Sequence, residues 1–186
     1  MSEVFVITGP SGVGKGTLIR GLLGRLPELE LSVSATTRRP RPGERDGVDY
    51  YFLTPEEFER HARQGDFVEH ATYSGNRYGT LRAELDRRLA AGTPVVLEIE
   101  VQGARQIRRS VPEAIAVFIA PPSQEALQAR LVGRGTDTGE QVQQRLLTAR
   151  QELAAQPEFG YVVVNGRLEE ATDELEQIVK AALARG

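Results

Sequence analysis

The segment from Gly9 to Thr17 constrains most strongly what this chain can fold into. It reads GPSGVGKGT and directly follows the apolar run Val4-Phe5-Val6-Ile7-Thr8. A strand that leads through a glycine-rich turn into a helix can bind phosphate, because backbone amides and the helix N-terminus face the anion. The motif predicts a nucleoside triphosphate site with Lys15 at the terminal phosphates, and the alternative is a plain glycine turn. The predicted loop residues are Gly9, Pro10, Ser11, Gly12, Val13, Gly14, Lys15, Gly16 and Thr17.

The metal side of this loop departs from the usual pattern. Gly16 stands where the motif has a serine or threonine hydroxyl for magnesium, and Thr17 follows one place later. Three interpretations of Thr17 therefore stay open: a direct metal ligand, a ligand through water, or no metal contact.

Composition bounds the class of protein. The 186 residues are 40% hydrophobic and 26% charged and include no cysteine. These values are typical of a single globular α/β unit, and the absence of cysteine excludes disulfides and thiolate catalysis. We find no apolar stretch of membrane-spanning length and no leader pattern, so a cytoplasmic enzyme without a membrane partner is the simplest expectation. The net charge of −3 argues against a nucleic-acid partner.

Strand-like and helix-like segments alternate along the chain. Apolar runs predict strands at 3–8, 31–35, 95–99, 114–120 and 161–164, and periodicity predicts helices at 15–26, 80–91, 101–110, 123–132, 140–155 and 169–183. A short helix is expected after Thr54, with Pro55 at its first position. The alternation predicts a parallel sheet with helices on both faces. The polar stretches 36–80 and 133–140 are candidate functional insertions.

The first insertion carries a concentrated set of anion-binding groups. Arg38, Arg39, Arg41 and Arg45 lie within eight residues, close to Tyr50 and Tyr51. Guanidinium groups and tyrosine hydroxyls both donate hydrogen bonds to phosphate oxygens, although a solvated basic loop is the alternative for any single arginine. One triphosphate site and a second anion site together predict phosphoryl transfer between two bound molecules.

Motifs along the whole chain resemble those of the guanylate kinase family. They are the GPSGVGK loop, the block Ser32–Glu44, Gly47–Phe52, Phe67–His70, Ser74–Thr80, Leu97–Gly103, Arg130–Thr136 and Val163–Asn165. The resemblance implies a three-layer P-loop NTPase fold with a mostly parallel sheet, a GMP-binding insertion and a small lid. It implies one domain over 1–186, with core regions 1–33, 81–123 and 156–186, a GMP-binding region 34–80 and a lid 124–155.

The resemblance also implies roles for residues of the insertion. The counterparts of Arg38, Arg41, Tyr50 and Tyr78 hold the GMP phosphate. Glu69 accepts from guanine N1–H and the exocyclic amine, Ser34 contacts O6, and Thr80 lies near the base. A carboxylate suits guanine because that edge offers two donors, which adenine does not.

Further roles concern magnesium and the lid. The family commonly has aspartates at the positions of Glu98, near magnesium, and Glu100, near the guanine amine, so both carboxylates here are one methylene longer. Thr17 and Glu98 are the expected Mg²⁺ ligands, and Glu98 as an ordinary strand-end acid is the alternative. Arg130, Arg134 and Asn165 are expected at ATP, and Lys15, Arg38, Arg134 and Arg145 are expected to assist catalysis.

The predicted reaction is ATP + GMP = ADP + GDP, which serves purine nucleotide recycling, with dGMP as a further possible acceptor. Two alternatives stay open. One is a nucleoside monophosphate kinase of different base specificity, because the GKGT sequence also occurs in adenylate kinases. The other is a non-catalytic interaction module, against which the intact phosphate-binding loop argues. The oligomeric state is not predicted.

Overall fold

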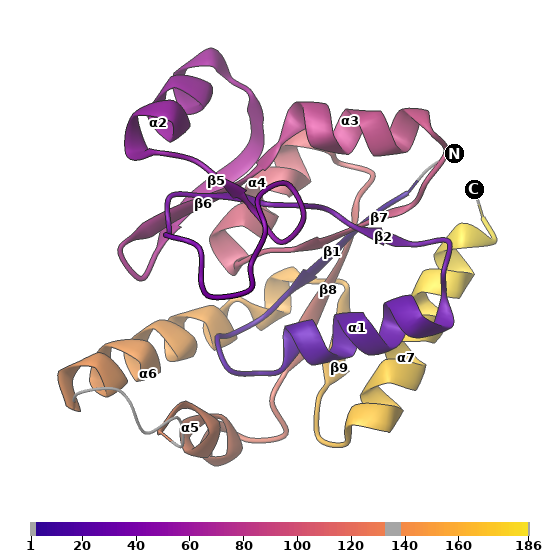
Figure 1. Ribbon diagram of the computed structural model, residues 1–186. Coiled ribbons are helices and arrows are strands. Elements are labelled where there is room, and N and C mark those ends of the chain that lie inside the picture. Colours follow the sequence, from indigo (N-terminus) through magenta and orange to yellow (C-terminus); the bar gives the residue numbers. More distant parts are fainter. Residues whose placement is uncertain (1–2, 133–138, 186) are drawn as a thin grey trace.

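The computed structural model describes residues 3–132 and 139–185, and its centre is a five-stranded parallel sheet (Figure 1). The strand order is β2-β7-β1-β8-β9. The bounds are β1 Val4–Thr8, β2 Glu30–Leu31, β7 Val95–Glu98, β8 Ile115–Ala120 and β9 Tyr161–Val164. In the middle of the sheet, Val6 lies beside Leu97 on one side and Ala116 on the other. The near-continuous apolar runs predicted as strands at 3–8, 95–99, 114–120 and 161–164 are confirmed.

Helices cover both faces of this sheet, as predicted. Phe5 and Ile7 point to one face and pack with α1 (Lys15–Arg25), α5 (Gln124–Val132) and α7 (Leu168–Leu183). Val4 and Val6 point to the opposite face and pack with α3 (Arg82–Ala90) and α4 (Val101–Ser110). Alternate residues of one central strand therefore enter two separate cores, which is why both faces must be apolar. Helix α6 (Gly139–Ala154) and the short 3₁₀ helix Gln156–Glu158 lie between α5 and β9 in the chain.

The insertion between α1 and α3 forms a second, four-stranded sheet of order β4-β3-β6-β5. Its strands are β3 Ala35–Thr36, β4 Tyr51–Phe52, β5 Phe67–Tyr73 and β6 Asn76–Leu81. Helix α2 (Pro55–Gln64) packs on it through Phe58, which stacks on Phe67. Thr54 caps this helix as predicted: its side chain accepts from the Glu57 amide while the Glu57 carboxylate accepts from the Thr54 amide.

The single strand predicted at 31–35 is wrong, because this segment crosses from one sheet to the other. The Ser32 amide donates to Val96 O of the central sheet at 2.9 Å, whereas Ser34 O accepts from the Tyr51 amide of the insertion at 2.9 Å. Each partner is distant in sequence, so no local pattern could show the crossing. For the helix predicted at 80–91, the observed start is two residues later, at Arg82, because β6 continues to Leu81.

The other helix predictions agree with the observed bounds to within one or two residues. Within the described ranges, no helix is both long enough and apolar enough to span a membrane.

Candidate functional site

The glycine-rich loop follows β1 and opens α1 at the carboxyl end of the central sheet. Gly9 and Gly14 have φ values of 144° and 97°, which L side chains rarely adopt. A Cβ atom at Gly9 would lie 2.3 Å from Ile119 O, and one at Gly14 would lie 2.6 Å from Asn165 Nδ2. Glycine is therefore required at both positions by conformation and by space.

Lys15 is folded back over this loop. Its ammonium donates to Gly9 O at 2.7 Å and to Pro10 O at 3.4 Å, and its side chain is only 8% exposed. The same ammonium lies 3.9 Å from Glu100 Oε2. The cation is thus held over the loop, with a carboxylate beside it.

Arg130 and Asn165, predicted at ATP, brace the loop from behind. Asn165 Nδ2 donates to Val13 O at 2.8 Å, and Arg130 donates to Val13 O at 3.2 Å and to Asn165 O at 3.3 Å. Two side chains from distant parts of the chain therefore hold one carbonyl of the loop. Arg134, the other predicted ATP residue of the lid, lies outside the described residues.

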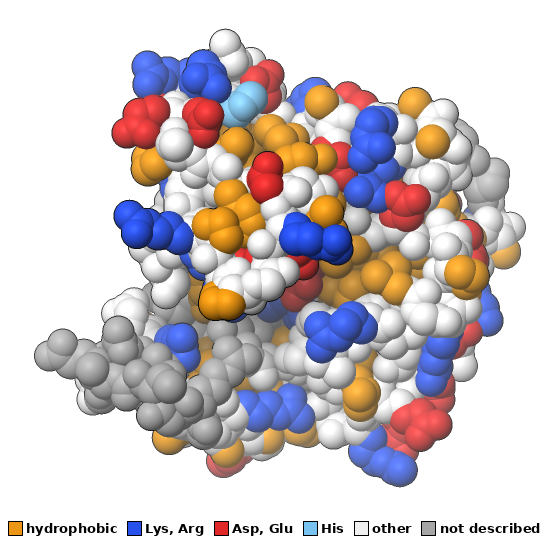
Figure 2. Space-filling model, in the orientation of Figure 1, with side chains coloured by type: hydrophobic (Ala, Val, Ile, Leu, Met, Phe, Trp, Pro, Cys, Tyr) orange, Lys and Arg blue, Asp and Glu red, His pale blue; other side chains and the backbone are white. Residues whose placement is uncertain are grey.

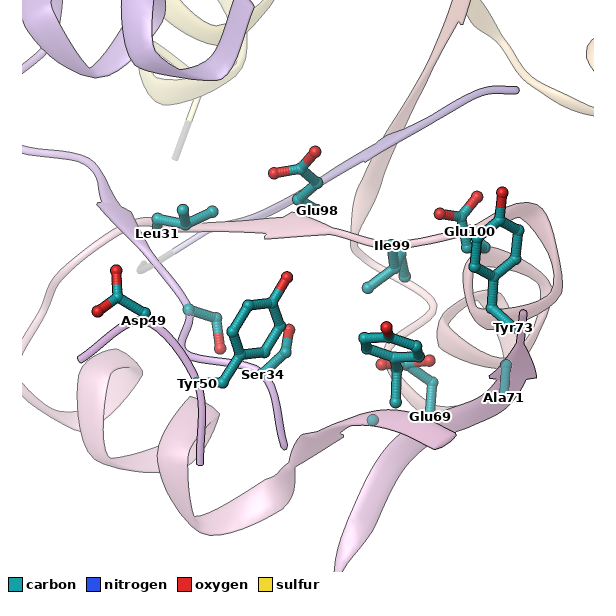
Figure 3. Close-up of a pocket in the computed structure, with 13 residues that line it drawn as sticks. Leu31, Ser34, Asp49, Tyr50, Glu69, Ala71, Tyr73, Glu98, Ile99 and Glu100 are labelled. Atoms are coloured by element: carbon teal, nitrogen blue, oxygen red, sulfur yellow. The ribbon is translucent and has the colours of Figure 1, made fainter. Parts of the chain in front are cut away.

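A cavity of about 270 Å³ opens between the two sheets, next to the loop (Figure 3). In the same orientation as Figure 1, the space-filling view shows blue basic side chains on both sides of the hollow between the insertion and the core (Figure 2). Five of the eight predicted GMP residues line the cavity, together with the predicted metal ligand Glu98: Ser34, Tyr50, Glu69, Tyr78 and Glu100.

Glu69 provides the most buried carboxylate of this cavity. The residue is 4% exposed, and its Oε1 accepts from Thr80 Oγ1 at 2.7 Å. Burial raises the pKa of Glu69 to about 7, the Thr80 hydrogen bonds oppose this, and the charge of Glu100 adds to it. Thr80 lies outside the cavity lining and reaches the site through Glu69.

Tyr50 and Tyr78 also line the cavity, and Arg38 lies beside Tyr50. The rings of Tyr50 and Tyr78 meet edge to face with centroids 6.3 Å apart, and the Arg38 guanidinium lies 5.2 Å from the Tyr50 ring centroid. Arg38 forms a two-point pair with Glu44 at 2.8 and 3.0 Å, and the Arg41 amide donates to the same carboxylate at 2.7 Å. Glu44 thus contacts both arginine residues, Arg38 through its guanidinium and Arg41 through its backbone amide. Neither Arg38 nor Arg41 lines the cavity itself.

Glu98 lies at the end of β7, beside the start of α1. Its Oε1 is 3.5 Å from the place a Cβ would take at Gly16. Burial raises the pKa of Glu98, and the nearby Lys15 charge lowers it. Thr17 Oγ1 accepts from Arg20 at 3.1 Å. The 3.5 Å separation at Gly16 is an ordinary contact distance, so Glu98 lies directly beside the loop.

Magnesium usually binds through one or two carboxylates and the substrate phosphates. Among the described residues there is no cluster of three metal-ligating side chains. Glu98 beside the loop fits a metal carried by a bound triphosphate.

Glu152 of α6 is a site residue that the sequence analysis missed. Its Oε2 accepts from the Ser11 amide of the loop at 3.2 Å, and the residue is 8% exposed. Burial, followed by the charge and hydrogen-bonding contact of Glu100, raises the pKa of Glu152. Arg145 lies two helical turns earlier. Burial raises the pKa of Tyr73, whereas hydrogen bonding to Ser11 and the nearby charge of Arg145 lower it. The seven-residue spacing from Arg145 was the available signal, because it places both residues on one face of a helix.

A phosphate-binding loop on a parallel α/β sheet, with an adjoining cavity of polar groups, defines a P-loop protein that can bind two ligands side by side. The chain belongs to the guanylate kinase family, whose family model, described as "Guanylate kinase", matches residues 1–182. It is 54% identical to a guanylate kinase of Parasynechococcus marenigrum (strain WH8102), over 96% of this chain and 98% of the relative.

Two further relatives agree with this membership. A guanylate kinase of Thermobifida fusca (strain YX) is 53% identical over 95% of this chain and 90% of its own length. The crystal structure of guanylate kinase from Anaplasma phagocytophilum superposes with a TM-score of 0.78 at 34% identity, covering 97% of this chain and 85% of that one.

Proposed function

We propose that this chain transfers the terminal phosphoryl group of ATP to GMP, with ATP on the glycine-rich loop and GMP in the cavity between the sheets. The single observation that supports this assignment of ATP and GMP to two adjoining sites is the contact between the loop and the cavity. Glu100 lines the cavity and also lies 3.9 Å from the Lys15 ammonium of the loop. The two proposed sites are therefore direct neighbours, because the same carboxylate borders both.

The guanine base belongs at the Glu69 end of the cavity. The ionised carboxylate offers acceptors to N1–H and the exocyclic amine, Ser34 can donate to O6, and Glu100 supplies a second acceptor for the amine. Thr80 orients Glu69 through their 2.7 Å hydrogen bond. Adenine lacks both donors, so this end favours GMP over AMP.

The GMP phosphate belongs at Tyr50 and Tyr78 of the cavity, with Arg38 and Arg41 placed outside the lining as further donors. The pairing of Arg38 with Glu44 supports this assignment, because it holds the guanidinium in one orientation beside Tyr50. Tyrosine hydroxyls and guanidinium groups then donate to separate phosphate oxygens.

Phosphoryl transfer needs no proton-abstracting side chain, because the acceptor is an anionic phosphate. An oxygen of the GMP phosphate forms a bond to the γ-phosphorus of ATP while the bond to the β–γ bridging oxygen breaks, and ADP leaves. Lys15 turns from the loop carbonyls to the β- and γ-phosphates. Arg38, Arg145 and the lid residue Arg134 neutralise the charge that spreads over the group in transit.

Glu98 and Thr17 are the residues of this chain that would hold Mg²⁺ together with a bound triphosphate. When bound, the ion neutralises phosphate charge and aligns the triphosphate. Removal of magnesium by a chelator should therefore abolish turnover. The proposed substrates place the reaction in the cytoplasm, and dGMP is a further proposed acceptor.

The test is a coupled ADP-release assay with ATP and magnesium, in which GMP, dGMP, AMP, CMP and UMP are offered separately. Turnover with GMP far above AMP, CMP and UMP is the expected result. Preference for AMP would keep the transfer mechanism and overturn the roles of Glu69 and Ser34. No turnover with any acceptor would favour an interaction module instead.

A further inference from the structure

We infer that Gly103 of helix α4 is a positioning residue for guanine selection, because its missing side chain makes the space that the Glu69 carboxylate occupies. This inference rests on the proposed function, in which Glu69 reads the base. A Cβ atom at Gly103 would lie 2.4 Å from Glu69 Oε2 and 3.1 Å from Glu69 Cδ. One face of the guanine-reading carboxylate thus rests directly on a helix backbone.

Helix geometry alone does not explain a glycine here. Gly103 is the third residue of α4, where its φ is in the ordinary negative range, and glycine is a poorer helix former than alanine. The next neighbour outside the Glu69 carboxyl is Ile99 Cβ at 3.5 Å, an ordinary contact distance. The carboxylate of Glu69 is therefore the group for which this position must lack a side chain.

Helix α4 cannot move aside easily, because hydrogen bonds on both sides of Glu69 hold it to β5. The side-chain amide of Gln106 donates through Nε2 to His70 O at 2.7 Å, and its Oε1 accepts from the His70 backbone amide at 3.1 Å. Ser110 Oγ donates to Val68 O at 3.0 Å. The two residues that flank Glu69 in the chain are thus both bonded to the helix that carries Gly103.

The carboxylate is held from the other side by Thr80, whose hydroxyl donates to Oε1 at 2.7 Å. An added methyl group at Gly103 must push Oε2 away by about 1 Å to reach an ordinary contact of 3.4 Å. A displacement of this size at a positioned group can lower binding or catalysis by up to about a hundredfold. The loss should fall on GMP and spare ATP.

The experiment compares Gly103→Ala with Gly24→Ala by equilibrium binding of GMP and of ATP, together with KM, kcat and the thermal midpoint. Gly24 is a matched control, since it is also a helical glycine of ordinary φ and an added Cβ there meets nothing within 4 Å. We expect Gly103→Ala to weaken GMP binding tenfold to about a hundredfold. ATP binding should change less than about twofold, and Gly24→Ala should leave both affinities unchanged.

A double variant separates action through Glu69 from a general packing defect. If Gly103 acts through this carboxylate, alanine at 103 weakens GMP binding no further once Glu69→Ala is present. An equal additional loss in that background, or unchanged GMP affinity in Gly103→Ala, overturns the inference. Should Gly103→Ala fail to fold, recovery of folding in Glu69→Ala/Gly103→Ala supports the contact, and failure of both overturns it.

The outcome is distinguishable from failure of the proposed function. Wild-type preference for an acceptor other than GMP defeats the proposed function itself. GMP-specific turnover in the wild type, with GMP affinity retained in Gly103→Ala, defeats only the role of Gly103.

Discussion

The carboxylate of Glu69 is buried, which is unfavourable for a charged group, and it is also the proposed acceptor for the guanine base. With 4% exposure, it loses most of its hydration and keeps one strong hydrogen bond, from Thr80. Such a group costs stability when it is ionised and is best satisfied by a ligand that brings two donors. Guanine offers two such donors, N1–H and the exocyclic amine. Binding of the base would therefore supply hydrogen bonds to the Glu69 oxygens.

Glu69→Gln should therefore lower the selectivity for GMP. The amide keeps the shape of the side chain but replaces one acceptor oxygen with a donor, which then faces a donor of guanine. The lost charge-assisted hydrogen bond corresponds to about 1.5–3 kcal/mol, or a tenfold to hundredfold rise in KM for GMP. Steady-state kinetics with ATP held saturating measures this, and an unchanged ratio of GMP to AMP turnover would remove Glu69 from base reading.

The raised pKa of Glu69 also predicts a pH dependence of GMP binding. With a pKa of about 7, the carboxylate is largely protonated below neutral pH and then cannot accept from both guanine donors. GMP affinity should fall by about fourfold from pH 8.5 to 6.5, a range above the second pKa of a phosphate monoester. Calorimetric titration across this range measures the change. Glu69→Gln is the control, and an equal pH dependence in that variant would contradict the assignment.

Helix α6 is joined to the phosphate-binding loop by one buried carboxylate. Glu152 accepts from the Ser11 amide and lies against Glu100. The amide that it uses belongs to the loop proposed to bind ATP, so ligand binding and the position of α6 are connected through this contact. The family resemblance predicts a lid that includes this helix, but it does not indicate which residue connects the helix to the loop.

Replacement of Glu152 by glutamine should flatten the dependence of stability on pH. Burial and Glu100 raise the folded-state pKa of Glu152, so the folded protein retains a proton that the unfolded chain has lost. Stability from this group is present below the ordinary pKa of glutamate and is lost as pH rises through the raised value. Urea unfolding from pH 5 to 9 should show a smaller decline for Glu152→Gln than for the wild type. The exposed Glu174→Gln serves as the control, and parallel declines in all three proteins would refute this account.

The elements that could be predicted are those whose cause is local. Continuous apolar residues revealed β1, β7, β8 and β9, and Thr54 with Pro55 revealed the start of α2. The crossing between sheets at 32–34 depends on hydrogen bonds to Val96 and Tyr51, so it could not be read from its own residues.

The same distinction applies to the site. The glycine-rich loop was predicted from its motif, because its chemistry lies within nine consecutive residues. Glu69 was assigned only through the family resemblance, since its burial depends on the packing of α4 against β5. Glu152 was missed because an acid on an amphipathic helix is usually solvated, and only the tertiary structure brings it to Ser11.

At the scale of the whole molecule, the site lies where parallel strands end and a second sheet is attached. The loop follows β1. Glu98 is the last residue of β7, Glu100 lies two residues beyond it, and Asn165 follows β9. Ligands in α/β proteins characteristically bind at this carboxyl edge. The insertion then covers the edge from one side, and its sheet has a small core of its own around Phe58 and Phe67.

This arrangement predicts that the two nucleotides will stabilise different parts of the chain. GMP alone should slow amide hydrogen exchange in residues 34–36, β5 and β6, because Ser34, Glu69 and Tyr78 are its proposed contacts. ATP with magnesium should slow exchange in residues 9–20 instead. Each ligand at a hundredfold excess over its Kd should add about 2.7 kcal/mol of stability.

Hydrogen exchange by mass spectrometry, with each nucleotide added separately, resolves these regions. The Glu69→Gln variant should lose protection by GMP in β5 and β6 and keep protection by ATP in the loop, since its substitution lies in only one site. Protection of the loop alone by GMP would mean that GMP binds the phosphate cradle, and the assignment of the two sites would then be wrong. Protection of both regions by either nucleotide would instead show that the two sites are coupled, because Glu100 of the cavity and Lys15 of the loop lie 3.9 Å apart.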